Sequence, residues 1–159
     1  MESSPNEYFL TLGKKLFHKQ LYNKAQDCFE VAITINPNDD NAYIWLGLVL
    51  REQEKYEDAE DALRNAIIMD SKNASAHIGL GTVLSLQGKY PSAEESLRRA
   101  ISLEPNNTKA YEWLSVVLKN QNREQEADAI IQKIIKKDKK TSSSTTKFNY
   151  YRTCRTFTG

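Results

Sequence analysis

Few side chains in this 159-residue sequence could perform chemistry, and their spacing brings none of them together. The two histidines, His18 and His77, and the two cysteines, Cys28 and Cys154, form neither a Cys-x-x-Cys nor a His-x-x-x-His pair, so no common metal site is indicated. Gly79-Leu80-Gly81 falls inside an expected helix, whereas a phosphate-binding glycine loop joins a strand to a helix. We therefore expect no catalytic residue, no metal and no cofactor, and the sequence is not that of an enzyme.

The sequence instead repeats itself every 34 residues. Two leucine columns, one alanine column and one isoleucine column each have four members at this interval, which is the signature of a repeat architecture. The columns are Leu12, Leu46, Leu80 and Leu114; Leu16, Leu50, Leu84 and Leu118; Ala25, Ala59, Ala93 and Ala127; and Ile33, Ile67, Ile101 and Ile135.

Each copy predicts two helices joined by a short turn. In the second copy, the apolar spacing indicates helices over residues 43–52 and 56–69, with a turn at 53–55. Between copies, residues 36–39 and 104–107 combine a proline, which ends the outgoing helix, with Asp or Asn residues that can cap the next helix. No stretch alternates with period two, so no strand is expected.

Three glycines fall in the middle of first helices, where glycine costs about 0.5–1 kcal/mol relative to alanine. We expect the second helix of each copy to approach too closely there for a side chain, with alanines as the facing sites. The glycines are Gly13, Gly47 and Gly81, and the alanines are Ala25, Ala59 and Ala93.

The order of these residues resembles the tetratricopeptide repeat. In the first copy, Leu12-Gly13 is followed by Ala25, Phe29, Ala32 and Pro37. The resemblance implies an all-α fold, a right-handed superhelical α-solenoid of antiparallel helix pairs. It covers residues 6–140, after an N-terminal extension at residues 1–5, in four repeats of about 6–39, 40–73, 74–107 and 108–141.

The two ends of the array differ from its middle. Small apolar pairs on one face of the later first helices (Ala42/Val49, Ala76/Val83 and Ala110/Val117) should contact the preceding repeat, whereas the first copy has Tyr8 and Lys15 there. The stack is therefore expected to begin at the first copy. At the other end, Lys137 occupies an apolar column and Ile134 an alanine column, so we expect four repeats and no fifth. Because Ile130 takes the position of Cys28, Ala62 and Ser96, some apolar surface should remain, which predicts self-association through the C-terminal repeat.

Charge is divided unevenly along the chain. Residues 1–132 contain 14 basic and 20 acidic residues, whereas residues 133–159 contain eight basic residues and one acidic residue. Residues 142–159 form a basic, low-complexity tail that we expect to be disordered. Because aromatic and basic residues alternate over 147–157, the tail could contact nucleic acid or an anionic membrane surface. The favoured alternatives are a solvated tail or one that covers the last repeat.

The location is predicted from what the sequence lacks. No apolar run approaches the roughly 18–20 residues that span a membrane, and no apolar stretch of a secretory signal follows the acidic N-terminus. Two cysteines without matched spacing are typical of a reducing compartment. We therefore expect a cytoplasmic protein.

The resemblance implies that the first helices line a concave groove, where clustered apolar residues mark an interaction site. We expect Gly79 to leave open space between Trp45 and Trp113, and an alternative places Leu10, Ile44 and Ile78 between helices. The candidate groove residues are Leu10, Lys14, Phe17, Ile44, Trp45, Leu48, Arg51, Ile78, Gly79, Thr82, Trp113, Val116 and Lys119.

The family comparison also removes some functions. Chaperone-binding members clamp a carboxylate with Lys, Asn and Arg, but the matching positions here offer one charged ligand, Lys14. The asparagine ladder of sugar-transferring members is absent, since Trp45, Gly79 and Trp113 occupy three of its positions. The sequence therefore predicts a scaffold or adaptor that binds a partner peptide or helix with an apolar stripe. The alternatives are an adaptor with a nucleic-acid- or membrane-binding tail, and a regulatory piece of a separate catalytic protein.

Overall fold

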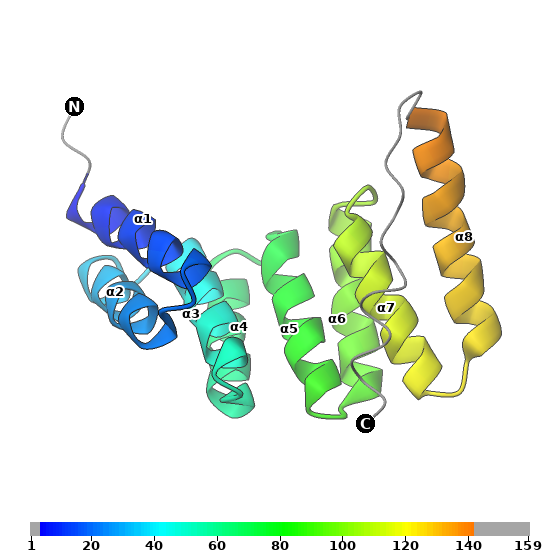
Figure 1. Ribbon diagram of the computed structural model, residues 1–159, viewed down its shortest axis with the longest axis horizontal. Helices are drawn as coiled ribbons and strands as arrows, with labels where there is room; N and C mark the ends of the chain where they lie inside the picture. Colours follow the sequence, from blue (N-terminus) through cyan, green and yellow to red (C-terminus); the bar gives the residue numbers. More distant parts are fainter. Residues whose placement is uncertain (1–3, 142–159) are drawn as a thin grey trace.

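The computed structural model describes residues 4–141, with side chains as far as Ile135. This part of the chain forms eight helices in four antiparallel pairs, without a strand, which confirms the predicted all-α solenoid (Figure 1). The helices are α1 (Pro5–His18), α2 (Tyr22–Ile35), α3 (Asp40–Glu52), α4 (Tyr56–Met69), α5 (Ala74–Leu86), α6 (Tyr90–Leu103), α7 (Thr108–Asn120) and α8 (Glu124–Thr141). The tail prediction concerns residues 142–159, which lie outside this range.

The links between repeats start the first helices as the sequence predicts, with one exception. The Asp39 carboxylate accepts hydrogen bonds from backbone N–H groups at the start of α3, and the Asn73 side chain does the same for α5. The Asn107 side chain makes no such bond to α7 and instead donates to Glu104 over 2.8 Å. Because Asp39 caps the helix, α3 begins three residues earlier than its apolar pattern indicates.

The turn within each repeat contains a residue with positive φ at the same 34-residue interval. These residues are Gln20 (φ 60°), Glu54 (φ 61°), Gly88 (φ 75°) and Asn122 (φ 59°). The N–H of the following residue donates to a carbonyl five residues earlier, as in the bond from Lys55 to Leu50 over 2.9 Å. This closure turns the chain sharply enough to make the two helices of a repeat antiparallel.

The repeats stack through the faces that the sequence assigned to this contact. Ala42 and Val49 of α3 are fully buried, and so are the matching alanine and valine of α5 and α7. In α1, Tyr8 is 57% exposed and Lys15 is also exposed. The small apolar pair therefore contacts the preceding repeat wherever one is present, as predicted.

The three mid-helix glycines lie at close contacts with the second helix of their own repeat, as predicted. A Cβ atom at each position would come within 2.6 Å of a buried side chain on the second helix of the same repeat. The nearest atoms belong to Phe29 for Gly13, Leu63 for Gly47 and Leu97 for Gly81. At Gly81 the Ala93 carbonyl oxygen, at 3.2 Å, is also among the nearest atoms. One large side chain per repeat therefore fills the space that the glycine leaves.

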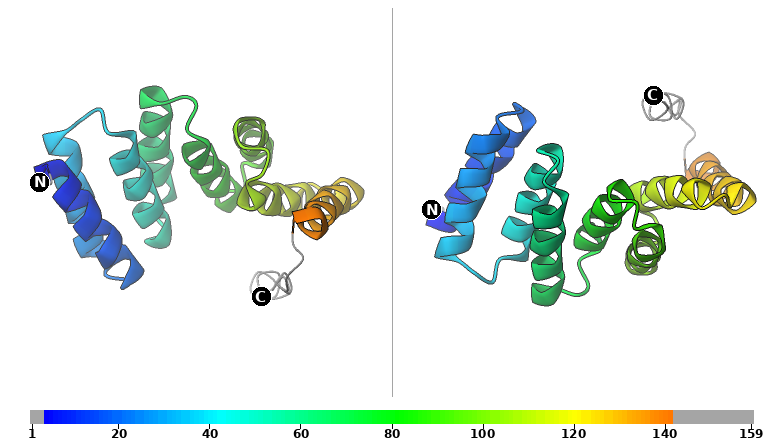
Figure 2. Two further views of the ribbon diagram at one scale, coloured as in Figure 1. Left: turned by 90° about the horizontal axis from the view of Figure 1, so that it is seen from above. Right: turned by 90° about the horizontal axis from the view of Figure 1, so that it is seen from below.

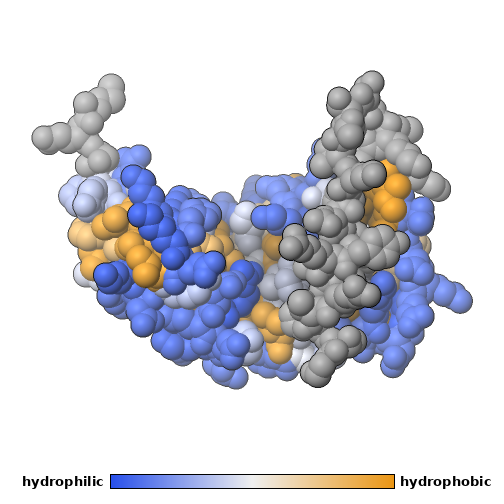
Figure 3. All heavy atoms as spheres, viewed as in Figure 1, coloured by the Kyte–Doolittle hydropathy of each residue, from blue (hydrophilic) through white to orange (hydrophobic). Residues whose placement is uncertain are grey.

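The stack curves, with the first helices on its inner side. Among the described residues, α1 approaches α3, α3 approaches α5 and α5 approaches α7, whereas no Cα atoms of successive second helices lie within 8 Å of one another. The pairs follow one another along the long axis (Figure 2), and the surface is hollowed between the two ends (Figure 3). The concave surface is therefore formed by α1, α3, α5 and α7, as the resemblance implies.

Candidate protein-binding groove

The N-terminal half of the concave surface is built around Trp45 of α3. Its ring stacks on Phe29 of α2, with ring centroids 6.0 Å apart and planes 22° apart, and meets Phe17 of α1 edge-on at 5.5 Å. The Lys14 ammonium nitrogen lies 5.4 Å from the Trp45 ring centroid, a cation–π contact of about 0.5–1 kcal/mol at exposed sites. Trp45 is half-buried. It therefore belongs both to the core between the first two repeats and to the concave surface.

His18 extends this half of the surface and is absent from the sequence-predicted groove. Its exposed imidazole lies 6.1 Å from the Trp45 ring, centroid to centroid, and 5.8 Å from that of Phe17. His18 follows Lys14 by four residues, so both occupy one face of α1. The four-residue spacing from Lys14 is the signal in the sequence that could have identified His18 as a groove residue.

Three predicted groove residues, Ile44, Thr82 and Gly79, are buried in the structure. Ile44 is 5% exposed because it packs with Ala66 and Ala76, as the alternative interpretation held. Thr82 is 1% exposed, and its hydroxyl donates to a carbonyl of its own helix. Gly79 leaves no open space, since a Cβ atom there would lie 2.7 Å from Leu63 Cδ2. The open space that the sequence predicts at Gly79 is therefore absent from the middle of the concave surface.

The C-terminal half presents a mixture of apolar and charged groups on α7. Trp113 is half-buried against the main core, and Val116 is 37% exposed. Glu112 takes the position that Ile78 occupies one repeat earlier and is half-buried. Burial raises the pKa of the Glu112 carboxyl, and the positive charge of Lys109 opposes this shift.

The remaining predicted groove residues lie at its surface. Four apolar ones, Leu10, Phe17, Leu48 and Ile78, are half-buried. Arg51 is half-buried and forms an ion pair of 2.5 Å with its neighbour Glu52, and Lys119 is exposed. Their contact with a partner stays a prediction.

The two sides of the solenoid differ in charge. Over the described side chains, the first helices carry five basic and four acidic residues, and the uncharged α5 lies in their middle. The second helices carry five basic and eleven acidic residues. The acidity found in the sequence is therefore concentrated on the outer side, and the groove repels an acidic partner far less than the outer surface would.

Polar contacts between the repeats hold the groove in shape. Side chains at 34-residue intervals reach back to the preceding second helix: Lys55 Nζ lies 3.5 Å from Gln26 Oε1, Lys89 Nζ 2.8 Å from Glu60 Oε2, and Arg123 Nη1 2.6 Å from Glu94 Oε2. This series of contacts was not predicted, although the 34-residue intervals are visible in the sequence.

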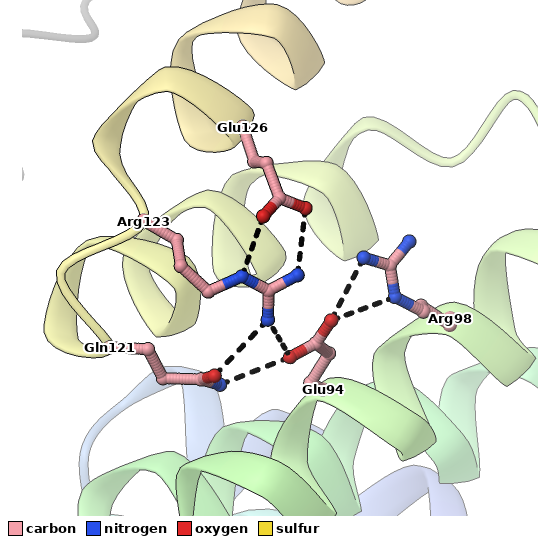
Figure 4. A network of polar contacts seen from close by, with 5 residues as sticks. All are labelled: Glu94, Arg98, Gln121, Arg123 and Glu126. Carbon is pink, nitrogen blue, oxygen red and sulfur yellow. Dashed lines mark hydrogen bonds and ion pairs between the residues drawn. The ribbon is translucent and has the colours of Figure 1, made fainter.

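The last of these contacts is part of a network that joins α6, α7 and α8 (Figure 4). Glu94 accepts hydrogen bonds from Arg98, Gln121 and Arg123, and Arg123 also donates to Glu126 through two nitrogens. Burial alone would raise the Glu94 pKa, but the hydrogen bonds from Arg98, Arg123 and Gln121 outweigh it and lower the pKa. The network therefore fixes α7, the last helix of the groove.

No group of titratable side chains forms a second kind of site within residues 4–135. No three His, Cys, Asp or Glu residues gather there as metal ligands. Cys28 is buried, and burial together with the nearby Asp27 carboxylate raises the pKa of its thiol. His77 Nε2 lies 3.0 Å from the Ser71 carbonyl oxygen, and Cys154 lies outside the described residues. In the same part of the chain, no helix has the length and apolar character needed to cross a membrane.

Comparisons with known proteins agree with this architecture. Family models described as tetratricopeptide repeat match residues 39–104 and residues 84–144. The chain is a tetratricopeptide repeat protein. No curated protein matches it.

Several solved structures share the fold. A crystal structure of MamA is 26% identical, with a TM-score of 0.79 over 87% of this chain and 81% of that chain. A Thermobaculum terrenum O-GlcNAc transferase mutant is also 26% identical, with a TM-score of 0.70 over 74% of this chain and 23% of that chain. The first TPR of Spaghetti (RPAP3), bound to the HSP90 peptide SRMEEVD, is 20% identical, with a TM-score of 0.73 over 77% of this chain and 97% of that chain.

Proposed function

We propose that this protein is a non-enzymatic scaffold whose concave surface holds a segment of a partner protein. The tetratricopeptide repeat fold supports protein–protein interaction in general. The observation that carries the proposal here is the set of partly exposed aromatic and apolar side chains on the inner face, above all Trp45, Trp113 and Val116. Clustered apolar surface of this kind marks interaction sites.

The two halves of the groove favour a partner segment with an apolar stripe. The apolar side chains of the partner segment would contact Trp45 at one end and Val116 at the other, and the segment would cross α5 between them. An acidic group near α1 would meet Lys14, and a basic group near α7 would meet Glu112 and favour its charged form. The structure with an HSP90 peptide supports a peptide as the type of occupant. The same carboxylate clamp is disfavoured, because Lys14 is the one charged residue at the positions that match the clamp.

The proposal is tested with peptides selected from a random library on the full-length protein. Val116→Glu and Lys14→Glu change the two halves of the groove, and Ile68→Glu is the matched control, since Ile68 is 73% exposed on α4. We expect each groove variant to weaken binding about tenfold or more, as at a typical hot spot. Peptides that bind all three variants equally, or that lose affinity only for Ile68→Glu, would contradict the proposal.

The alternatives depend on parts of the protein outside the groove. Contact of segment 142–159 with nucleic acid or an anionic surface concerns residues outside the described range, and steeply salt-dependent binding would support it. A regulatory role beside a separate catalytic protein would use the same groove. A cytoplasmic location remains a prediction from the sequence.

A further inference from the structure

One face of α8 has the residues of a contact between repeats but lies at the end of the described chain. Asp128, Ile131 and Ile135 follow one another at i, i+3 and i+7, so they share a helix face. The residues at the same positions in the earlier second helices are Gln26, Phe29 and Ile33; Glu60, Leu63 and Ile67; and Glu94, Leu97 and Ile101. We call Asp128, Ile131 and Ile135 the terminal face.

In the first three repeats, the following repeat contacts this face. The middle residue (Phe29, Leu63 or Leu97) is fully buried in each case. Leu63 shows how this happens, because its Cδ2 atom lies only 2.7 Å from where a Cβ atom on Gly79 of the following α5 would be. On the terminal face, by contrast, Ile131 is half-buried and Ile135 is 41% exposed. The following repeat therefore covers this apolar face in each of the first three repeats, whereas the terminal face on α8 remains partly exposed.

Asp128 is the polar residue of the terminal face, and among the described residues no cation from a following repeat pairs with it. Glu60 and Glu94 each bind a cation from the following repeat, Lys89 over 2.8 Å and Arg123 over 2.6 Å. The Lys89 hydrogen bond is the largest cause of the lowered Glu60 pKa. Asp128 occupies the same position and is exposed. A group that completes the terminal face should therefore bring both apolar side chains and a positive charge.

We propose that segment 142–159 of this chain binds the terminal face. Its aromatic side chains cover Ile131 and Ile135, and one of its cations pairs with Asp128 as Lys89 pairs with Glu60. The segment has the required chemistry, with four aromatic and three basic residues and no acidic one: Phe148, Tyr150, Tyr151 and Phe157, and Lys147, Arg152 and Arg155.

Chain length and charge both favour this occupant. The segment starts directly after Thr141, which is ten residues, or about 15 Å of helix, beyond Ile131. Eighteen residues can span up to about 60 Å, so the segment reaches the whole face. A second copy of the terminal face would bring the same three residues, and hence a second Asp128 carboxylate and no cation. Charge complementarity therefore selects the basic segment over self-association through α8.

The native Cys154 gives a direct test in the full-length protein. The only other cysteine, Cys28, is buried, so a nitroxide spin label can be attached at Cys154. We expect the label to cause a loss of NMR signal intensity for the methyl groups of Ile131 and Ile135, and none for Ile68 on α4. Asp128→Lys should restore part of the lost intensity, because it replaces attraction by repulsion.

Two controls separate binding from tethering and from self-association. The triple variant Phe148→Ser, Tyr150→Ser and Tyr151→Ser keeps the tether length but removes three aromatic groups, so the loss of intensity should become smaller. An equal loss in this variant would overturn the proposal, because the tether alone would then explain the effect. Signal loss in unlabelled Cys154→Ser protein mixed with labelled protein would also overturn it, since the contact would then join two copies.

Discussion

Leu63 gives the sharpest test of the packing between the second and third repeats. Two glycines face this fully buried side chain, Gly47 from its own repeat and Gly79 from the next one. A Cβ atom at Gly47 would lie 2.6 Å from Leu63 Cγ, and one at Gly79 would lie 2.7 Å from Leu63 Cδ2. Because Cγ is the branch point of the side chain, Gly47→Ala forces the whole of Leu63 to move. Gly79→Ala moves a terminal methyl group and should cost less.

The expected magnitude follows from two opposing effects. Overpacking costs about 1–3 kcal/mol, and replacing a mid-helix glycine by alanine returns about 0.5–1 kcal/mol. Gly47→Ala should therefore lower the free energy of unfolding by about 0–2.5 kcal/mol. Leu63→Ala should cost about 2–5 kcal/mol through the lost side chain and the cavity. In the double variant, the new methyl group enters this cavity, so the combined loss should be smaller than the sum by about 1 kcal/mol or more.

Chemical denaturation followed by far-ultraviolet circular dichroism measures these free energies. Gly88→Ala is the matched control, because Gly88 has φ +75° and no atom within 4 Å of its expected Cβ. Gly88→Ala should destabilise through backbone conformation alone, and its effect should add to that of Leu63→Ala. Stabilisation by Gly47→Ala, or strict additivity with Leu63→Ala, would refute the proposed contact.

Three further predictions concern the caps, the acid limit and the groove tryptophan. Asp39→Ala should cost about 0.5–2 kcal/mol of unfolding free energy, whereas Asn107→Ala should cost less, because only Asp39 caps its helix; equal losses would contradict this. The pKa values of Glu60 and Glu94 lie below 4.5 in the folded state, so their stabilisation is complete above that pH and is lost as the pH falls through the folded pKa. Glu94→Gln should thus flatten the fall of the melting temperature below pH 4.5, and an unchanged pH profile would speak against the network. Trp45→Ala should lower the melting temperature as well as partner binding, because its ring stacks in the core; an unchanged melting temperature would show that this stacking does not stabilise the fold.

The sequence predicts the fold because the 34-residue period links local and long-range structure. Once one copy is recognised as two helices, the same columns fix all eight, and Ala42 with Val49 marks the contact to the preceding repeat. The glycine columns predict close contacts for the same reason. The side chain nearest to each glycine could not be predicted, because helical spacing does not show how far a side chain such as Leu63 extends from the next helix.

The groove is less predictable for a related reason. The spacing of residues on one helix shows which face a side chain occupies, but its burial depends on the helices of neighbouring repeats. Ile44 and Thr82 share the inner face with Val116, yet the first two are buried and Val116 is 37% exposed. Trp45 combines both roles, since Phe29 from a different helix supports one side of its ring. The ion pairs of Lys89 with Glu60 and of Arg123 with Glu94 also depend on distances between repeats, which the spacing along one helix does not give.

Fluorescence of the two tryptophans tests the central proposal most directly. Trp45 and Trp113 are the only tryptophans, and each lies half-buried on a first helix at one half of the groove. Trp113→Phe and Trp45→Phe report on them one at a time, and acrylamide quenching is measured with and without a saturating library-selected peptide. We predict that the peptide reduces quenching of both tryptophans. Saturating binding that leaves the quenching of both unchanged would show that the partner binds elsewhere and would contradict the proposed groove.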